Sequence, residues 1–402
     1  MTRNVTVLSA VSLAQDAASE LLYPLLPILL TTILGAPAAV VGVVEGVAEG
    51  AAAVMKYLSG RWSDRSGRKP WIAVGYGLAA VGKVIVAAAA IWPVVLVGRV
   101  VDRTGKGIRG APRDALLADG VEKSQLGRVF GFHRAADTLG AVIGPLVGLA
   151  VLTFAGGNIK VALWVAVVPA VLSVALVVLV REPARPEVAH RGVAPAAAGT
   201  AAPLAGGPLP PEFTRVVTVL TMIALVNFPD ALVLLRLSEF GFSATGVVAS
   251  YVLYNLVYTL VSYPAGALSD RLPQARVYAL GLVCFAIGYV GLGLADNASM
   301  MVVLLCVYGG FNGFTDGVGK AWISGLVAPA VRGRAQGVFQ GLMGGSVLVA
   351  GLWAGLAWQL GPGNGVVPLI IAGSVAAVAV PVVWIWGDRL SRSATLTPSA
   401  ER

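Results

Sequence analysis

Seven ionisable side chains occur between residues 99 and 114. On an α-helix they would fall within about 140° of the circumference and form one polar stripe. A charge at the centre of a bilayer costs about 2.5–3.5 kcal/mol on insertion scales, so a lipid-facing helix could not carry this stripe. A helix lining a water-filled cavity could use it to bind a charged solute. The stripe contains Arg99, Asp102, Arg103, Lys106, Arg109, Arg113 and Asp114.

Acidic side chains that could act with this stripe recur at helical spacing on neighbouring segments. Asp16 and Glu20 lie one turn apart, and Tyr23 continues their face. Burial disfavours the charged form of a carboxylate and nearby bases favour it, so such acids can exchange protons in a physiological range. The predicted proton-coupling residues are Asp16, Glu20, Arg99, Asp102 and Asp137. The alternative is that these charges form fixed ion pairs that only hold helices together. This alternative explains Glu45 and Glu49 on the second span, and Arg134 and Asp137 on the fifth, equally well.

The second half of the chain carries fewer charges, together with amides and tyrosines at helical spacing. We predict that it supplies substrate-binding surface, although a seam between packed helices would explain its tyrosines as well. These side chains are Asn227 and Asp230; Tyr251, Tyr254, Asn255 and Tyr258; and Tyr308, Asn312, Asp316 and Lys320. The predicted substrate-binding residues are Tyr23, Arg103, Lys106, Asn227, Asp230, Asn312 and Asp316.

The elements that must position these residues are membrane-spanning helices. The 402 residues are 57% hydrophobic and 12% charged, whereas soluble domains carry about a quarter charged residues. Several apolar runs approach or reach the roughly 20 residues that a spanning helix needs. Eleven breaks divide the chain into twelve expected spans. The breaks lie near 35–38, 60–69, 92–93, 119–126, 154–160, 181–212, 238–243, 270–276, 295–299, 327–334 and 361–365.

The net charge of +9 is distributed as a topology signal. Every second break carries Lys and Arg, and the intervening breaks hold only Lys160. This is the positive-inside pattern, with both termini cytoplasmic, and it replaces nucleic-acid binding as the explanation of the basic excess. We therefore expect a multi-pass protein of a prokaryotic cytoplasmic (inner) membrane, in contact with the lipid bilayer.

An internal repeat divides the chain. Ser63-Asp64-Arg65 recurs as Ser269-Asp270-Arg271, and Gly127-Arg128 recurs as Gly333-Arg334, both with an offset of 206 residues. Parallel repeats of six spans are one architecture of secondary transporters. The prediction is an all-α integral membrane protein with about twelve transmembrane helices in two pseudo-symmetric six-helix bundles. Its parts are residues 1–180, a flexible Pro/Ala/Gly-rich cytoplasmic linker at 181–212, residues 213–388, and a cytoplasmic tail at 389–402.

The loop after the second span resembles the cytoplasmic signature of the major facilitator superfamily. The signature is Gly, three residues, Asp, a base, any residue, Gly and two bases, and it matches Gly60, Asp64, Arg65, Gly67, Arg68 and Lys69. The second copy keeps Gly266, Asp270 and Arg271. The resemblance implies a latch between the halves and a cavity lined by the first, fourth, seventh and tenth helices. The expected cytoplasmic gate adds Arg113, Asp114, Asp270 and Arg271 to the residues of this loop.

Two further helices resemble family motifs. The fourth span is similar to the family's buried-arginine motif through Arg99 and Gly105, with Asp102 in place of Gln and Arg103 in place of Gly. The fifth span resembles the motif of the drug–proton antiporter branches, except that Leu149 replaces a final Gly. Its Gly140, Gly144 and Gly148 share a face for close packing, and Pro145 bends the helix. The antiporter-type motif comprises Gly131, Gly140, Gly144, Pro145 and Gly148.

Together these observations predict a secondary active transporter that exports a small organic, drug-like solute, anions included, in exchange for protons by alternating access. The alternative is proton-coupled uptake of an organic anion or metabolite. A membrane enzyme or lipid-handling protein is disfavoured because no catalytic set is visible, and a channel because buried charge in duplicated bundles suits alternating access. We expect a monomer that needs no cofactor. The only cysteines, Cys284 and Cys306, lie inside predicted spans and do not have the spacing of a zinc site, so we expect no metal.

Overall fold

The structure is a computed structural model that describes residues 1–182, 209–358, 360 and 364–395, and almost all of these are helical. Residues 183–208 of the predicted linker and residues 396–402 of the predicted tail lie outside the described residues. The first half contains α1 (Arg3–Leu22), α2 (Leu26–Ile28), α3 (Ala38–Ser66), α4 (Lys69–Ala88), α5 (Trp92–Leu117), α6 (Leu126–Phe154) and α7 (Ile159–Val177).

The second half repeats this arrangement, and apart from a gap between α8 and α9 its helices end near the predicted breaks. When α1–α2 and α8–α9 are each taken as one interrupted span, the described helices form twelve spans, as predicted. The second half contains α8 (Pro211–Ala224), α9 (Asp230–Glu239), α10 (Ala244–Ser269), α11 (Gln274–Leu294), α12 (Ala298–Leu326), α13 (Arg332–Leu356) and α14 (Val366–Thr395).

Eight of the described helices are long and apolar enough to cross a membrane. Helix α5 is not among them because its seven ionisable residues exceed what an apolar span tolerates. The first span is interrupted after Leu22 by a 3₁₀ turn and, at Leu29–Ile33, by a π-helical turn. Pro24 and Pro27 cause this irregularity, since proline has no amide hydrogen for the helical ladder.

The seventh span is broken between α8 and α9, which the sequence analysis did not predict. Pro229 stands directly before α9 and disfavours helical geometry at the residue before it. Side chains satisfy carbonyl groups freed by the break: the Trp353 indole donates to the Leu225 carbonyl at 2.8 Å, and the Tyr289 hydroxyl to that of Phe228 at 3.3 Å. Such interrupted backbone is tolerated at membrane depth where protein surrounds it or a cavity borders it.

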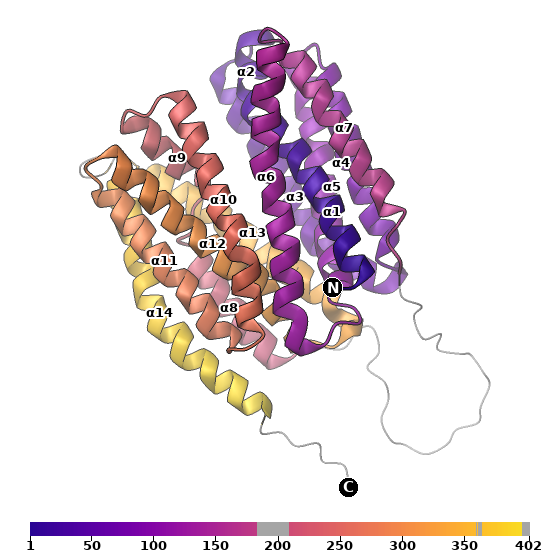
Figure 1. Cartoon of the computed structure of the whole chain (residues 1–402), viewed down its shortest axis with the longest axis vertical. Coiled ribbons are helices and arrows are strands. Elements are labelled where there is room, and N and C mark those ends of the chain that lie inside the picture. The colour runs from indigo at the N-terminus through magenta and orange to yellow at the C-terminus, as the bar shows by residue number, and fades with distance from the viewer. Residues whose placement is uncertain (183–208, 359, 361–363, 396–402) are drawn as a thin grey trace, which may run out of the picture.

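The two halves lie side by side (Figure 1), and the most extensive contacts between them are those of α3 with α13 and of α6 with α10; α6 also contacts α12, and α5 also contacts α13. Glycines allow these close crossings. A Cβ atom on Gly60 would overlap the carbonyl oxygen of Gly333, and one on Gly266 would overlap that of Gly127. The crossings are related by the 206-residue repeat. They lie at the end of the molecule that holds the α3–α4, α5–α6, α10–α11 and α12–α13 connections, which we call the basic end.

The apolar cores of the two halves differ. The second half has one large core in which Phe285, Tyr289, Tyr308 and Phe311 are in contact. The first half has separate clusters, one around Leu8, Ile72 and Leu117 and another around Leu21, Leu29 and Leu163. The charged residues of α5 lie between these clusters. The first half therefore encloses a layer of ion pairs, and the second an aromatic core.

Candidate functional site

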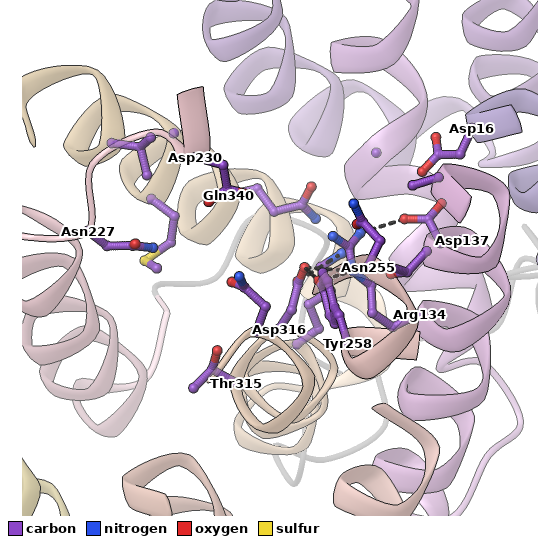
Figure 2. A pocket seen from close by; sticks show the side chains of 18 of the residues that line it. Asp16, Arg134, Asp137, Asn227, Asp230, Asn255, Tyr258, Thr315, Asp316 and Gln340 are labelled. Carbon is purple, nitrogen blue, oxygen red and sulfur yellow. Dashed lines mark hydrogen bonds and ion pairs between the residues drawn. The ribbon is translucent and has the colours of Figure 1, made fainter. Parts of the chain in front are cut away.

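A cavity of about 410 Å³ lies between the halves. Residues of the predicted stripe on α5 and of the predicted second-half surface line it, and Figure 2 shows Asp16 and Asp137 on one side with Asn227 and Asp230 on the other. A wider cavity of about 840 Å³ adjoins it and includes Tyr23, Glu45, Glu49, Arg103 and Pro145. Nine residues line both cavities: Glu20, Lys56, Lys106, Asn227, Asp230, Tyr251, Asn312, Gly344 and Val347.

Six alternating charges lie at one side of the smaller cavity, and all of them except Asp114 line it. Within the first half, Arg113 Nε lies 3.0 Å from Asp114 Oδ1, and Arg134 Nη1 lies 2.5 Å from Asp137 Oδ2. Arg113 Nη1 also lies 3.8 Å from Asp137 Oδ1, and Ser12 donates a hydrogen bond to Asp137. Lys320 and Asp316 of the second half, which pair with each other at 3.6 Å, join these residues into a closed loop that we call the six-charge ring. Its members are Arg113, Asp114, Lys320, Asp316, Arg134 and Asp137.

The six-charge ring joins the two halves. Arg134 Nε on α6 is 2.8 Å from Asp316 Oδ2 on α12, and Lys320 Nζ on α12 is 3.2 Å from Asp114 Oδ2 on α5. Tyr258 donates to Asp316 at 2.7 Å, and Arg134 donates to the same hydroxyl, as Figure 2 shows. Because two of these ion pairs cross between halves, the halves cannot separate here without breaking the ring.

The predicted stripe on α5 is divided between two environments. Arg99 and Asp102 line neither cavity and belong to a charge ladder inside the first half. Lys83 of α4 pairs with Asp102 at 2.8 Å, and Arg99 pairs with Asp102 at 3.2 Å and Glu45 at 2.7 Å. The ladder continues through Arg103, which is 3.9 Å from Glu45 and 3.2 Å from Glu49. Lys83 was missed because it is a single base inside an apolar run.

Replacement of Lys83 by leucine should destabilise the protein strongly. Lys83 is fully buried, and breaking a buried ion pair typically costs about 3–5 kcal/mol because the partner charge is left unpaired. Asp102 keeps Arg99, so we expect about 3 kcal/mol for Lys83→Leu. Thermal unfolding in detergent measures this effect. The double variant K83L/D102N should be more stable than K83L alone, and a double variant that is less stable would contradict the assignment.

Asp16, Glu20 and Lys106 differ from the ring and the ladder because, within the described part of the chain, none of them has an ion-pair partner within 4.0 Å. All three line the smaller cavity. Glu20 also lines the wider one, and its Oε2 atom is buried without a hydrogen bond. Lys56 was missed by the sequence analysis, although its spacing of seven residues from Glu49 places both on one face of α3.

Across the cavity, Asp230 is held by tyrosines of the second half. Tyr254 donates to its Oδ2 and Tyr308 to its Oδ1, each at 2.8 Å. Tyr308 also lies 3.3 Å from Asn227 Oδ1, and Asn312 donates to the Tyr254 hydroxyl at 2.6 Å. The structure thus brings Asn227, Asp230 and Asn312 together, and it places Asp316 apart from them in the six-charge ring.

At the basic end, the two copies of the repeated Asp cap helices of the opposite half. Asp64 at the end of α3 accepts hydrogen bonds from the backbone amides of Gly333 at 3.0 Å and Arg334 at 2.6 Å, at the start of α13. Asp270 at the end of α10 accepts from Gly127 at 2.7 Å and Arg128 at 3.0 Å, at the start of α6. A carboxylate at a helix N-terminus is favoured by the helix dipole. The repeated Asp of each half therefore caps the helix that begins with the repeated Gly-Arg of the other half, and we call these two contacts the crosswise caps.

The rest of the expected gate surrounds these caps. Arg68 pairs with Asp64 at 3.6 Å, contacts Asp119, and donates to the Pro329 carbonyl of the other half at 2.8 Å. Arg332 donates to the Ala118 carbonyl at 2.6 Å, which is a second contact between halves. Gly67 adopts a positive φ of 98° that favours glycine. The amides of Arg68 and Lys69 donate to Glu182, and Arg65 and Arg271 are exposed at their helix ends.

Removal of the second cap should weaken the closed basic end. Asp270→Asn keeps the shape of the side chain but removes its negative charge from the start of α6. A charge at a helix end is worth about 1 kcal/mol, so we expect the ratio of closed to open protein to fall roughly fivefold. Distances between spin labels at Lys123→Cys and Leu272→Cys, in a cysteine-free background, report this ratio. Arg271→Gln is the matched control, and an equal effect of both variants would contradict the assignment.

The glycines of the fifth-span motif allow α6 to pack closely against two helices, α1 and α10. Gly140 packs against the backbone of Leu13 and Ala17, and Gly144 against that of Ala17 and Leu21. Gly148 makes ordinary contact with Leu21, whereas Gly131 packs against Ser262 of α10 in the other half. Pro145 borders the wider cavity. This motif therefore seats α6 on the helix that carries Asp16 and Glu20.

The fold and the site together define a polytopic membrane protein with a charged cavity between two pseudo-symmetric helical halves. The sequence profile of the Major Facilitator Superfamily matches residues 8–229 and 216–400. The chain belongs to this superfamily and is a multi-pass membrane transporter of that type, which confirms the family indicated by the sequence motifs.

Relatives cover nearly the whole chain. A protein of Mycobacterium tuberculosis is 30% identical over 98% of this chain and 94% of its own length. An MFS-type transporter of Methanocaldococcus jannaschii is 28% identical over 90% of both chains, and the multidrug resistance protein MdtL of Klebsiella pneumoniae is 25% identical over 83% of both. The fold is similar to that of the human organic anion transporter MFSD10, with a TM-score of 0.72, 17% identity, and coverage of 95% of this chain and 99% of the other.

Proposed function

We propose that this transporter exports a small organic, drug-like solute from a prokaryotic cytoplasm in exchange for protons. The observation that carries the proposal is the pair Asp16 and Glu20, which face a cavity between the halves and have no ion-pair partner within 4.0 Å among the described residues. Lys106 borders the same cavity. A carboxylate in this position can take up and release a proton, and a solute bound in the same cavity can change its proton affinity, which is what exchange requires.

Alternating access follows from the contacts between halves. In this proposal the basic end faces the cytoplasm, so the crosswise caps and the six-charge ring close the cavity on that side. Protonation of Asp16 or Glu20 removes a negative charge beside the ring and Lys106, and thereby changes the relative stability of the two facing states. A ligand shifts such an equilibrium only through different affinities for the two states. The multidrug resistance protein among the relatives supports export.

Proteoliposomes with an imposed pH difference test this function. Proton efflux from acid-loaded vesicles that accompanies substrate entry would support exchange, whereas movement of both in the same direction would indicate uptake. We expect Asp16→Asn and Glu20→Gln, each tested separately, to abolish pH-driven transport while the protein still inserts and unfolds normally. Asp296→Asn, an exposed acid outside both cavities, is the control. Undiminished pH-driven transport in both cavity variants would refute the coupling role.

A further inference from the structure

One wall of the space where the two cavities meet carries bases without partners. Lys56 of α3 and Lys106 of α5 line both cavities, and in the described part of the chain neither side-chain ammonium group has an ion pair or a hydrogen bond. By contrast, Arg103 pairs with Glu49, and Arg113, Arg134 and Lys320 belong to the six-charge ring. Glu20 lines both cavities on the same half and, among the described residues, also has no ion-pair partner, so this wall carries two unpaired bases against one unpaired acid.

The opposite wall carries a carboxylate without a counter-ion. Asp230 receives one tyrosine hydroxyl on each oxygen, and it stands in the first turn of α9, where a negative charge is favoured. No Lys or Arg among the described residues lies within ion-pair distance of it. Two hydroxyl donors and a helix start stabilise the charged carboxylate without neutralising it, so a cation can still bind there.

An aromatic surface adjoins this carboxylate. Tyr251 lines both cavities and stacks on Tyr254 with ring centroids 5.8 Å apart, and Tyr254 stacks in turn on Tyr308 at 5.5 Å. Tyr254 and Tyr308 are the residues that hold Asp230. An ammonium group beside Asp230 can therefore also contact the tyrosine surface, which attracts cations through the ring quadrupole.

We propose that the cavity binds a small zwitterion, with its ammonium group at Asp230 beside Tyr251 and its acidic group between Lys56 and Lys106. This assignment rests on the proposed transport function and narrows its substrate class. A substrate with only one charge would leave the opposite wall uncompensated. The two cavities, of about 410 and 840 Å³, fall within the usual range for sites of drug-sized ligands.

Three forms of one molecule test the charge requirement. The probes are phenylalanyl-phenylalanine, its N-acetyl derivative, which keeps only the acid, and its C-terminal amide, which keeps only the amine. Binding to the purified full chain is measured by titration calorimetry. We expect the zwitterion to bind at least about tenfold more tightly than either relative, corresponding to about 1.4 kcal/mol for the additional charge contact.

Variants should separate the two walls. Asp230→Asn should weaken binding of the zwitterion and the amide about tenfold and leave the N-acetyl form unchanged. Lys106→Gln should weaken the zwitterion and the N-acetyl form and leave the amide unchanged, and Lys56→Gln should repeat this pattern if K106Q does not fold. Asp296→Asn should change none of the three. This crossed pattern cannot arise from a general loss of folding.

The zwitterion assignment would be overturned if the three probes bound with equal affinity or if none of them bound. It would also be overturned if only the N-acetyl form or only the amide bound. Uniform weakening of all probes by D230N or K106Q would also overturn it. Proteoliposome transport distinguishes this failure from failure of the proposed function. If pH-driven export of another solute persists and still requires Asp16 or Glu20, proton exchange stands and only the substrate class is wrong.

Discussion

Asp316→Asn should open the basic end and abolish most transport. Asp316 supplies the second-half carboxylate of the six-charge ring, and its loss leaves Arg134 without its ion-pair partner across the halves. Breaking a buried pair costs about 3–5 kcal/mol; since this carboxylate borders a cavity, we expect about 2 kcal/mol. That energy corresponds to a roughly 30-fold shift towards the open basic end. Spin-label distances between Lys123→Cys and Leu272→Cys should lengthen accordingly.

The double variant R134Q/D316N provides the critical comparison for the ring. It removes the base together with the acid, so neither is left facing an absent partner. Lys320 still pairs with Asp114, and Asp137 still pairs with Arg113. We expect its distance distribution to lie between those of the wild type and D316N. Asp296→Asn is the matched single-charge control. A double variant that is more open than D316N would show that the Arg134–Asp316 pair does not hold the basic end closed.

Gly60→Ala should have a comparably large effect on the closed state. The added methyl group would overlap the carbonyl oxygen of Gly333 and approach Gly337, both backbone atoms of the other half that cannot move aside alone. Overpacking of this kind costs about 1–3 kcal/mol, so the closed basic end should become less populated by roughly 5- to 150-fold. Spin-label distances and transport rates measure the change.

Gly50→Ala offers a control on the same helix. A methyl group there meets no atom within 4 Å, so the substitution adds helix propensity without a clash. We expect wild-type distances and unchanged or slightly higher thermal stability for G50A. If G50A and G60A shift the distances equally, the crossing of α3 and α13 is not what limits closure.

The sequence was most informative where physical constraints are repeated along the chain. Hydrophobic length, the alternation of basic breaks and the 206-residue repeat were sufficient for the twelve-span fold, because each depends on local composition. The two interrupted spans were not predicted, because the apolar pattern continues on both sides of Pro24, Pro27 and Pro229. The Trp353 and Tyr289 side chains that satisfy the broken seventh span also lie far away in the chain.

Candidate site residues were harder to assign because a helical stripe does not specify its neighbours. Arg99 and Asp102 share a face with Arg103, yet Lys83 and Glu45 from adjacent helices hold them away from the cavities. Asp316 was grouped with Asn312 by spacing, but Arg134 from the other half draws it into the ring. Which charge pairs with which depends on helix rotation and packing, and these follow from contacts between helices rather than from periodicity.

The crosswise caps have a consequence for how the halves recognise each other. Each half presents both a carboxylate at the end of one helix and the backbone amides at the start of another, and each binds the complementary feature of the other half. Such a surface is self-complementary in the sense of an isologous dimer interface, in which one patch meets a copy of itself. The join between the halves is therefore built like a two-fold homodimer contact whose two copies have been tethered into a single polypeptide.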